Sequence, residues 1–241
     1  MINLKNIYTD LGGTFVTPIE LVQERLKGIK AFVFDWDGVF NNGQKSETGG
    51  SNFSEVDSMG TNLLRYSYFL LKKQLPITAI ISGEKNETAF YFCERECFNY
   101  SFFKISNKKL ALEKLCAQEK IKAHEVAYFF DDVLDLPIAE SCGLRVMVNQ
   151  KANPLFLEYC KEFRMVDYAT ANSGGDFAVR EACELLMALN GNYAEVLNSR
   201  KNFDSHYDQY IQLRRDVKPE FFTLKDKELI AIQQGKIGFG K

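Results

Sequence analysis

The sequence predicts an α/β fold in which a doubly wound, mainly parallel sheet carries helices on both faces. Between residues 30 and 190, four short apolar runs alternate with longer stretches in which apolar residues recur at helical spacing. The runs lack the in-out alternation of a half-exposed strand, which is typical of parallel strands buried on both faces. Regular alternation of such strands with helices indicates a doubly wound sheet.

The elements follow from these patterns in chain order. The expected strands are Ala31 to Phe34, Ile77 to Ile81, Val126 to Phe130 and Leu144 to Val148. The expected helices of this region are Met59 to Lys73, Glu84 to Cys97, Lys108 to Gln118, Leu134 to Cys142 and Asp176 to Leu189. Ligands of such sheets bind beyond the carboxyl ends of the strands, so functional residues are expected there.

Length and composition predict one core domain with appendages. The chain has 241 residues, of which 46% are hydrophobic and 26% are charged, as in ordinary globular proteins. We expect an N-terminal extension over 1–29, a core domain over 30–190 and a partly helical tail over 191–241. Within the core domain, the polar, glycine-rich segment Asn41 to Asn52 predicts a loop or hairpin flap at about 40–54.

The two extensions have weaker patterns. The first ends in a predicted helix over Pro18 to Lys27, after the segment Asp10 to Thr14, which looks like a phosphate-binding turn of sugar kinases. No second such loop is found, so we interpret that segment as a structural turn. The tail has a predicted amphipathic helix over Ser205 to Arg215 and ends in GKIGFGK. Such a tail either docks in an assembly or is simply solvated, and the sequence leaves both open.

Charge and cysteine usage exclude several classes of function. The formal net charge is −2 and the pI is about 5.9, so no general field favours nucleic acid or a membrane. The six cysteines form no C-x-x-C pair and only two histidines exist, so no zinc site is expected. Unpaired cysteines fit a reducing compartment, and the first residues lack the pattern of a signal peptide. We therefore expect a cytoplasmic protein without a membrane span.

Carboxylates follow two of the predicted strands. Asp35 and Asp37 come directly after the first, and Asp131, Asp132 and Asp135 follow the third. One of each group could merely cap a turn or helix. A whole cluster at one sheet edge would repel itself unless a cation neutralised it, and hard oxygen ligands favour Mg²⁺.

Two further segments could bind phosphate at the same edge. Ser82 and Gly83 end the second strand, where a hydroxyl and backbone N–H groups can hold a phosphoryl oxygen. Lys108 and Lys109 open a helix from which a lysine could reach the strand ends. A solvated lysine is the alternative interpretation.

Four such motifs in this order resemble those of the haloacid dehalogenase superfamily. Within it, the chain is most similar to the phosphatases of 3-deoxy-octulosonate 8-phosphate and nonulosonate 9-phosphates. The resemblance covers residues 30–190, about two thirds of the chain. It rests on DWDGVFNNG (35–43), parts of FSEVDSMG (53–60), ISG (81–83), SNKKLAL (106–112), DDVLDLP (131–137) and SGGDFAVREACELL (173–186).

The resemblance implies a Mg²⁺-dependent phosphomonoesterase with no large cap domain. Asp35 would be the nucleophile that forms an aspartyl-phosphate, and Asp37 the general acid and base. Asp35, Asp37, Asp131 and Asp132 would hold the metal. Asp132 and Asp135 could equally be second-layer groups or helix-start residues.

The remaining roles concern a small phosphorylated sugar or sugar acid. Ser82 and Gly83 would hold its phosphoryl group. Lys108 would pair with that phosphoryl group and with Asp35. Lys108 fits this role better than Lys109, because its spacing to the following apolar residues matches the family pattern. The family also implies a tetramer whose neighbouring subunits cover the site. Arg180 would contact the substrate or a neighbouring chain, or else pair with a glutamate on its own helix.

Four positions depart from the family pattern: Asn42, Val56, Glu84 and Phe130. Glu84 stands where an arginine is usual, and so places an anion near an anionic substrate. Phe130 is bulky where the backbone usually passes close to the site. An alternative function is therefore a catalytically weak or inactive scaffold or regulatory subunit with the same fold.

Overall fold

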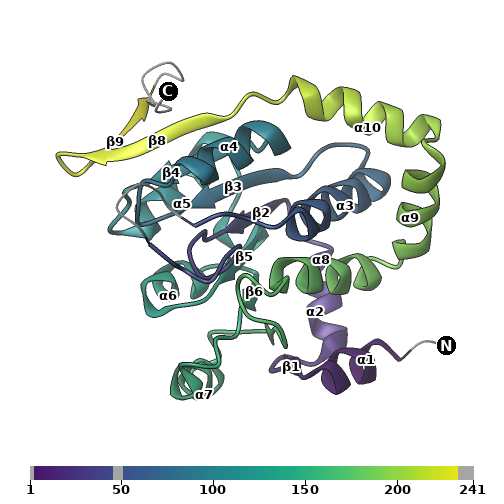
Figure 1. Ribbon diagram of the computed structural model, residues 1–241, viewed down its shortest axis with the longest axis horizontal. Coiled ribbons are helices and arrows are strands. Elements are labelled where there is room, and N and C mark those ends of the chain that lie inside the picture. Colours follow the sequence, from purple (N-terminus) through teal and green to yellow (C-terminus); the bar gives the residue numbers. More distant parts are fainter. Residues whose placement is uncertain (1–2, 46–50, 233–241) are drawn as a thin grey trace.

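A computed structural model describes residues 3–45 and 51–232, and within them one sheet of nine strands runs through the molecule (Figure 1). Its order is β1-β7-β6-β5-β2-β3-β4-β8-β9. The β1–β7 and β8–β9 pairs are antiparallel and the other pairs are parallel. The strands are β1 (Thr14–Phe15), β2 (Ala31–Phe34), β3 (Ile77–Ile81), β4 (Tyr100–Phe103), β5 (Val126–Phe130), β6 (Leu144–Met147), β7 (Tyr168–Ala169), β8 (Glu220–Lys225) and β9 (Glu228–Ile232).

Helices cover both faces of this sheet, as predicted for a doubly wound fold. The α-helices are α1 (Leu4–Leu11), α2 (Ile19–Leu26), α3 (Glu55–Lys72), α4 (Glu87–Glu96), α5 (Lys108–Glu119), α6 (Leu136–Ala139), α7 (Pro154–Glu162), α8 (Ala178–Leu189), α9 (Tyr193–Asn202) and α10 (Ser205–Asp216). Side chains of β2 alternate between the faces. Phe32 and Phe34 join the core cluster of α3 and α8, whereas Ala31 and Val33 join that of α5 and α6. None of the described helices is long and apolar enough to cross a membrane.

The four predicted strands are confirmed, with β6 ending one residue earlier than expected. The helix expected over Leu134 to Cys142 was wrong in extent, because Val133–Asp135 is a 3-10 turn and α6 is only four residues long. The other predicted helices are present with shifted ends. Five strands and the helices α1, α7 and α9 were not predicted, and β1 and β7 are two residues each, too short for a periodic pattern.

The N-terminal extension joins one edge of the sheet. Helix α1 ends at Gly12, whose φ of 113° is left-handed and favours glycine, and the chain then enters β1. Of the segment Asp10 to Thr14, interpreted from sequence as a structural turn, only Gly12 and Gly13 connect the elements, because Asp10 and Leu11 end α1 and Thr14 begins β1. The register pairs Thr14 with Ala169 of β7.

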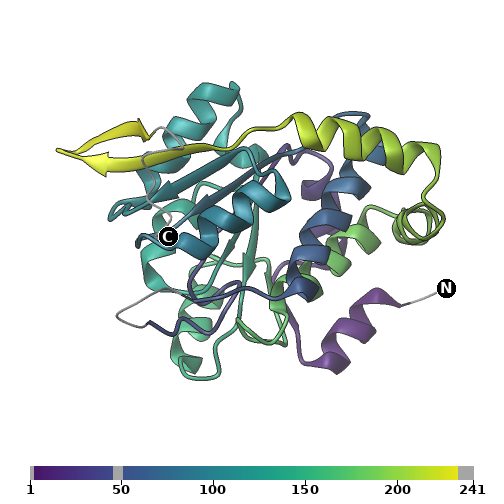
Figure 2. The same ribbon diagram turned by 45° about the horizontal axis from the view of Figure 1, so that its top comes forward.

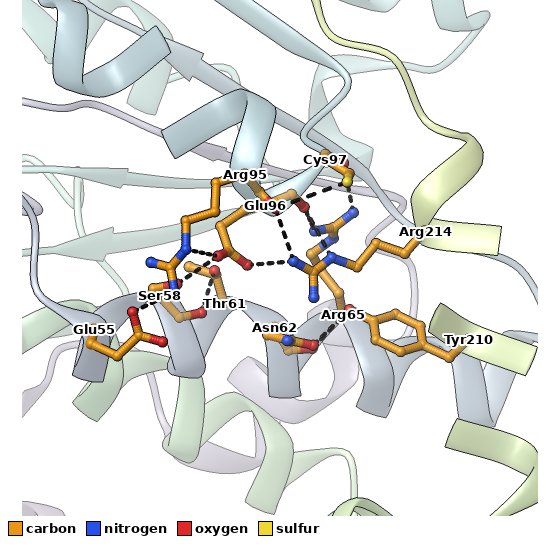
Figure 3. A network of polar contacts seen from close by, with 10 residues as sticks. All are labelled: Glu55, Ser58, Thr61, Asn62, Arg65, Arg95, Glu96, Cys97, Tyr210 and Arg214. Carbon is orange, nitrogen blue, oxygen red and sulfur yellow. Dashed lines mark hydrogen bonds and ion pairs between the residues drawn. The ribbon is translucent and has the colours of Figure 1, made fainter. Parts of the chain in front are cut away.

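The C-terminal segment crosses the molecule to the opposite edge (Figures 1 and 2). Helix α10 packs on α3, and β8 then extends the sheet beside β4, with Tyr100 opposite Glu220. A buried polar network fastens α10 (Figure 3). In it, Arg214 donates to the Glu96 carboxylate at 2.8 Å, and the Tyr210 hydroxyl donates to Asn62 Oδ1 at 3.0 Å. The segment thus packs on its own domain; residues 235–241, predicted as a loose end, lie outside the described part.

Candidate active site

The ends of three adjacent strands surround a cavity of about 220 Å³. Asp35 follows β2, Ser82 follows β3 and Asp131 follows β5, so parallel strands bring segments distant in the chain to one edge. The described lining residues are Asp35, Asp37, Lys45, Ser82, Gly83, Glu84, Lys108, Asp131, Asp132, Leu134 and Asp135. Of the eight residues proposed from sequence for the site, seven therefore line one cavity.

Three carboxylates converge inside it. Oxygens of Asp35, Asp131 and Asp135 lie within 4.8 Å of one another. Burial, and then the neighbouring carboxylates, raise the pKa of Asp35 to about 7 and that of Asp131 to about 8. Asp131 Oδ1 is buried and has no hydrogen-bond partner among the residues that the structure describes. An orphaned buried oxygen beside two further carboxylates fits a hard divalent cation such as Mg²⁺.

Lys108 is the buried cation of the cluster. Its Nζ lies 2.7 Å from Asp35 Oδ1 and 2.6 Å from Asp135 Oδ1, and its side chain is only 5% exposed. Burial alone would lower its pKa, but the two carboxylates hold that pKa above its ordinary value. Asn107 caps α5 by accepting from the N–H of Lys109 at 3.3 Å, and the Lys109 side chain is exposed. The ammonium group at the strand ends is therefore that of Lys108.

Asp135 has a more central place than the sequence indicated. Its Oδ1 accepts from Lys108 and from the Tyr128 hydroxyl at 2.5 Å, and its Oδ2 from the N–H of Asp132 at 3.4 Å. These bonds orient it toward Lys108. Asp132, expected as a metal ligand, is exposed and accepts from the N–H of Val133 at 2.7 Å, which caps the 3-10 turn. Asp135 rather than Asp132 completes the carboxylate cluster, because the turn directs the Asp132 side chain toward its own backbone.

Asp37 stands apart from that cluster. Its Oδ2 lies 2.5 Å from Lys45 Nζ, and its Oδ1 accepts from the Ser51 hydroxyl at 3.3 Å. Both partners belong to the predicted flap, whose described parts at 40–45 and 51–54 form no strand. Residues 46–50, where a hairpin would turn, lie outside the described residues.

The phosphate-binding residues expected after β3 lie at the cavity. The Ser82 hydroxyl is buried and accepts from the N–H of Glu84 at 3.2 Å, and a Cβ atom on Gly83 would meet no atom of the described residues within 4 Å. Glu84 itself is exposed at the cavity. Phe130 does not obstruct the site, because its fully buried ring packs beside Tyr128 in the core, with centroids 5.9 Å apart.

Close contacts from Gln150 and Gly174 hold the loop after Asp37 in place, and little in the sequence indicated these contacts. Gly38 has a φ of 88°, and a Cβ atom there would lie 1.9 Å from Asp131 Oδ2. Gln150 donates to the Gly38 carbonyl at 2.7 Å. A Cβ atom on Gly174 would lie 1.9 Å from that carbonyl oxygen, so glycine is required for the close approach. The Gly-Gly pair of the sequence pointed to this approach; nothing marked Gln150.

Arg180 does not line the cavity. Its guanidinium pairs with Glu184 at 2.7 Å, and its N–H donates to Asp57 Oδ1 at 2.8 Å. The sequence left open whether Arg180 contacts a substrate or neighbouring chain, or pairs with a glutamate on its own helix. In the single chain it pairs with the glutamate. Glu181, on the same helix, instead accepts from the N–H groups of Ala171 and Asn172.

Comparison with known proteins identifies relatives of this chain. No family model matches the chain. The 3-deoxy-D-manno-octulosonate 8-phosphate phosphatase KdsC of Escherichia coli (strain B / BL21-DE3) is 30% identical over 178 residues, which are 73% of this chain and 88% of the relative. The protein of the same name from Yersinia pestis is 28% identical over 172 residues, which are 69% of this chain and 83% of the relative.

Two solved structures share the fold. A probable YrbI family phosphatase from Pseudomonas syringae superposes with a TM-score of 0.64 and 29% identity, over 75% of this chain and 97% of that one. A 3-deoxy-D-manno-octulosonate 8-phosphate phosphatase from Moraxella catarrhalis, in complex with magnesium, phosphate and KDO, gives 0.61 and 26%, over 74% and 97%.

Proposed function

The chain belongs to the haloacid dehalogenase superfamily, in the subgroup of the 3-deoxy-D-manno-octulosonate 8-phosphate phosphatases, and from this premise we propose its reaction. It is a Mg²⁺-dependent phosphatase that hydrolyses the phosphomonoester of a small sugar or sugar acid through an aspartyl-phosphate on Asp35. The observation that carries this proposal is the buried Asp35 carboxylate, which Lys108 holds beside an Asp131 oxygen that no described residue hydrogen-bonds.

Each step uses a residue of the cavity. Lys108 orients Asp35 and favours its ionised form, so that the carboxylate can attack phosphorus and the bond to the sugar oxygen can break. Asp37 donates a proton to that leaving oxygen, then accepts one from the water that hydrolyses the acyl-phosphate. The Ser82 hydroxyl and the N–H groups around Gly83 hold phosphoryl oxygens. Mg²⁺, held by Asp35 and Asp131 with the backbone carbonyl of Asp37, would supply charge neutralisation.

The alternative, a catalytically weak or inactive scaffold, is not favoured. Two of the four departures that raised it leave the cavity open, because the Phe130 ring packs in the core and the Glu84 side chain is exposed at the cavity surface. The nucleophile, acid, lysine and metal ligands of the family pattern are all present.

We also propose the substrate class, the oligomeric state and the location of the protein. We take phosphorylated sugar acids as the first substrate class to test, since that is the class named for the relatives. A homotetramer and a cytoplasmic location follow from the family and from the unpaired cysteines. Sedimentation of the purified protein tests the tetramer, and fractionation of cells tests the location.

The deciding experiment measures phosphate release with Mg²⁺ across sugar and sugar-acid phosphates. Asp35→Asn should abolish turnover, and Asp10→Asn, which removes an exposed carboxylate of α1 that does not line the cavity, should leave it unchanged. Absence of release from every substrate, by folded protein that binds Mg²⁺, would favour the scaffold instead.

A further inference from the structure

Lys45 lies at the border of two neighbouring hollows. It lines the cavity of the carboxylates and also an adjoining cleft of about 460 Å³. Its side chain is 48% exposed, and its ammonium group pairs with the general acid Asp37 at 2.5 Å. Lys45 is the described residue that lines both hollows, so a ligand that occupied both would contact it.

The adjoining cleft has the chemistry of a sugar site. Amide and hydroxyl groups can both donate and accept, as the hydroxyls of a sugar require, and an aromatic ring can cover an apolar sugar face. The cleft is lined by Phe40, Asn41, Asn42, Gln44, Lys45, Ser51, Asn52, Phe53, Ser54 and Gly175. A phosphorylated sugar would thus place its phosphate in the cavity and its body in the cleft.

The charge in the cavity favours a further cation beside Lys108 and the proposed Mg²⁺. The described lining residues include six carboxylates and two ammonium groups. Lys108 is buried between Asp35 and Asp135, and so is already held on two sides. A phosphate dianion would add about two negative charges, with Glu84 facing the same space. Among these residues, Lys45 is the partly exposed cation with the freedom to turn toward it.

We propose that Lys45 is a substrate-positioning residue that exchanges its ion pair with Asp37 for one with the substrate's phosphoryl group. This inference rests on the proposed function, because it places a phosphate in the cavity. The exchange holds the phosphate at the border of the two hollows and leaves the Asp37 carboxyl group free to face the leaving oxygen. In the chain without substrate, the ion pair keeps the ammonium group at that border.

The test compares Lys45→Ala and Lys45→Arg with Lys85→Ala. Lys85 is a matched control, because it is 37% exposed, pairs with Glu87 at 3.6 Å and lines neither hollow. Steady-state kinetics on a sugar phosphate with Mg²⁺ give KM and kcat, and calorimetry gives the affinity for inorganic phosphate. In Lys45→Ala, we expect KM and the phosphate dissociation constant to rise about tenfold, as for one lost charge-assisted hydrogen bond, with kcat within about threefold.

Lys45→Arg should restore most of the affinity, and Lys85→Ala should match the wild type. Unchanged KM and phosphate affinity in Lys45→Ala would overturn the proposal, as would a lowered kcat at constant KM, which would mean that Lys45 acts only on Asp37. Phosphate binding separates this result from the proposed function. A wild-type chain that binds phosphate but hydrolyses nothing refutes the hydrolase, while the calorimetric comparison still decides the role of Lys45.

Discussion

Stabilisation of this protein by Mg²⁺ should depend steeply on pH between 6 and 8. The cause is the pair Asp35 and Asp131, whose pKa values burial and neighbouring carboxylates raise to about 7 and about 8. Without Mg²⁺ the pair holds protons that exposed carboxyl groups lose near pH 4. Mg²⁺ has to displace those protons in order to bind.

The direction in which the stability of the Mg²⁺-free protein changes with pH follows from the pKa values of these groups in the folded and the unfolded chain. A pKa raised in the folded state gives stability that is fully present below the unfolded value of about 4 and is lost as pH rises through about 7 to 8. The Mg²⁺-free protein should therefore become less stable over this window. Mg²⁺ acts oppositely, since its affinity rises as the pair ionises.

The two pKa values set the size of the Mg²⁺ effect on stability. Each displaced proton weakens Mg²⁺ binding by about tenfold per pH unit below its pKa, so the dissociation constant should rise roughly 100- to 1000-fold from pH 8 to pH 6. Free Mg²⁺ at a hundred times its dissociation constant at pH 8 adds about 2.7 kcal/mol. For a chain of this size, that raises the melting temperature by about 5–10 °C. At pH 6 the same Mg²⁺ should add almost nothing.

The assay is thermal unfolding at pH 6, 7 and 8, with Mg²⁺ and with a chelator. Asp131→Asn, which removes a proposed ligand, should abolish most of the Mg²⁺ effect at pH 8, whereas Asp10→Asn should not. An equal or larger Mg²⁺ effect at pH 6 would refute the reasoning, because the protonated carboxyl pair would then not compete with the metal.

Three substitutions test the supporting structure. Gly174→Ala should lower both kcat and the melting temperature, since overpacking costs about 1–3 kcal/mol. Gly28→Ala is the control and should be neutral, because a Cβ atom there would meet its nearest atom at 3.5 Å. Equal melting temperatures of the two variants would contradict the close approach at Gly174. Arg214→Ala removes the α10 partner of a buried glutamate and should cost about 3 kcal/mol in urea unfolding. The exposed Arg215→Ala should cost less than about 0.5 kcal/mol, and similar losses in both would count against the network. Asp135→Asn should lower kcat about 10- to 100-fold by releasing the buried lysine, and an unchanged kcat would show that this contact does not matter.

The sequence by itself determined the central sheet and most residues of the cavity. Strands β2 and β5 are apolar and buried along their whole length, and β3 and β6 are buried at all but one residue each, so local pattern detects all four as short, mainly apolar runs. Because parallel strands end at the same edge, Asp35, Ser82 and Asp131 could be placed together from their positions after those runs.

Only the tertiary structure decided how the side chains pair. Asp135 rather than Asp132 faces Lys108, because a 3-10 turn directs one carboxylate inward and uses the other as its cap. The pairing of β8 with β4 joins residues about 120 positions apart, and the contact of Lys45 with Asp37 depends on the course of an irregular loop. Periodicity reports which face of an element is buried, but it carries no information about which distant element covers that face.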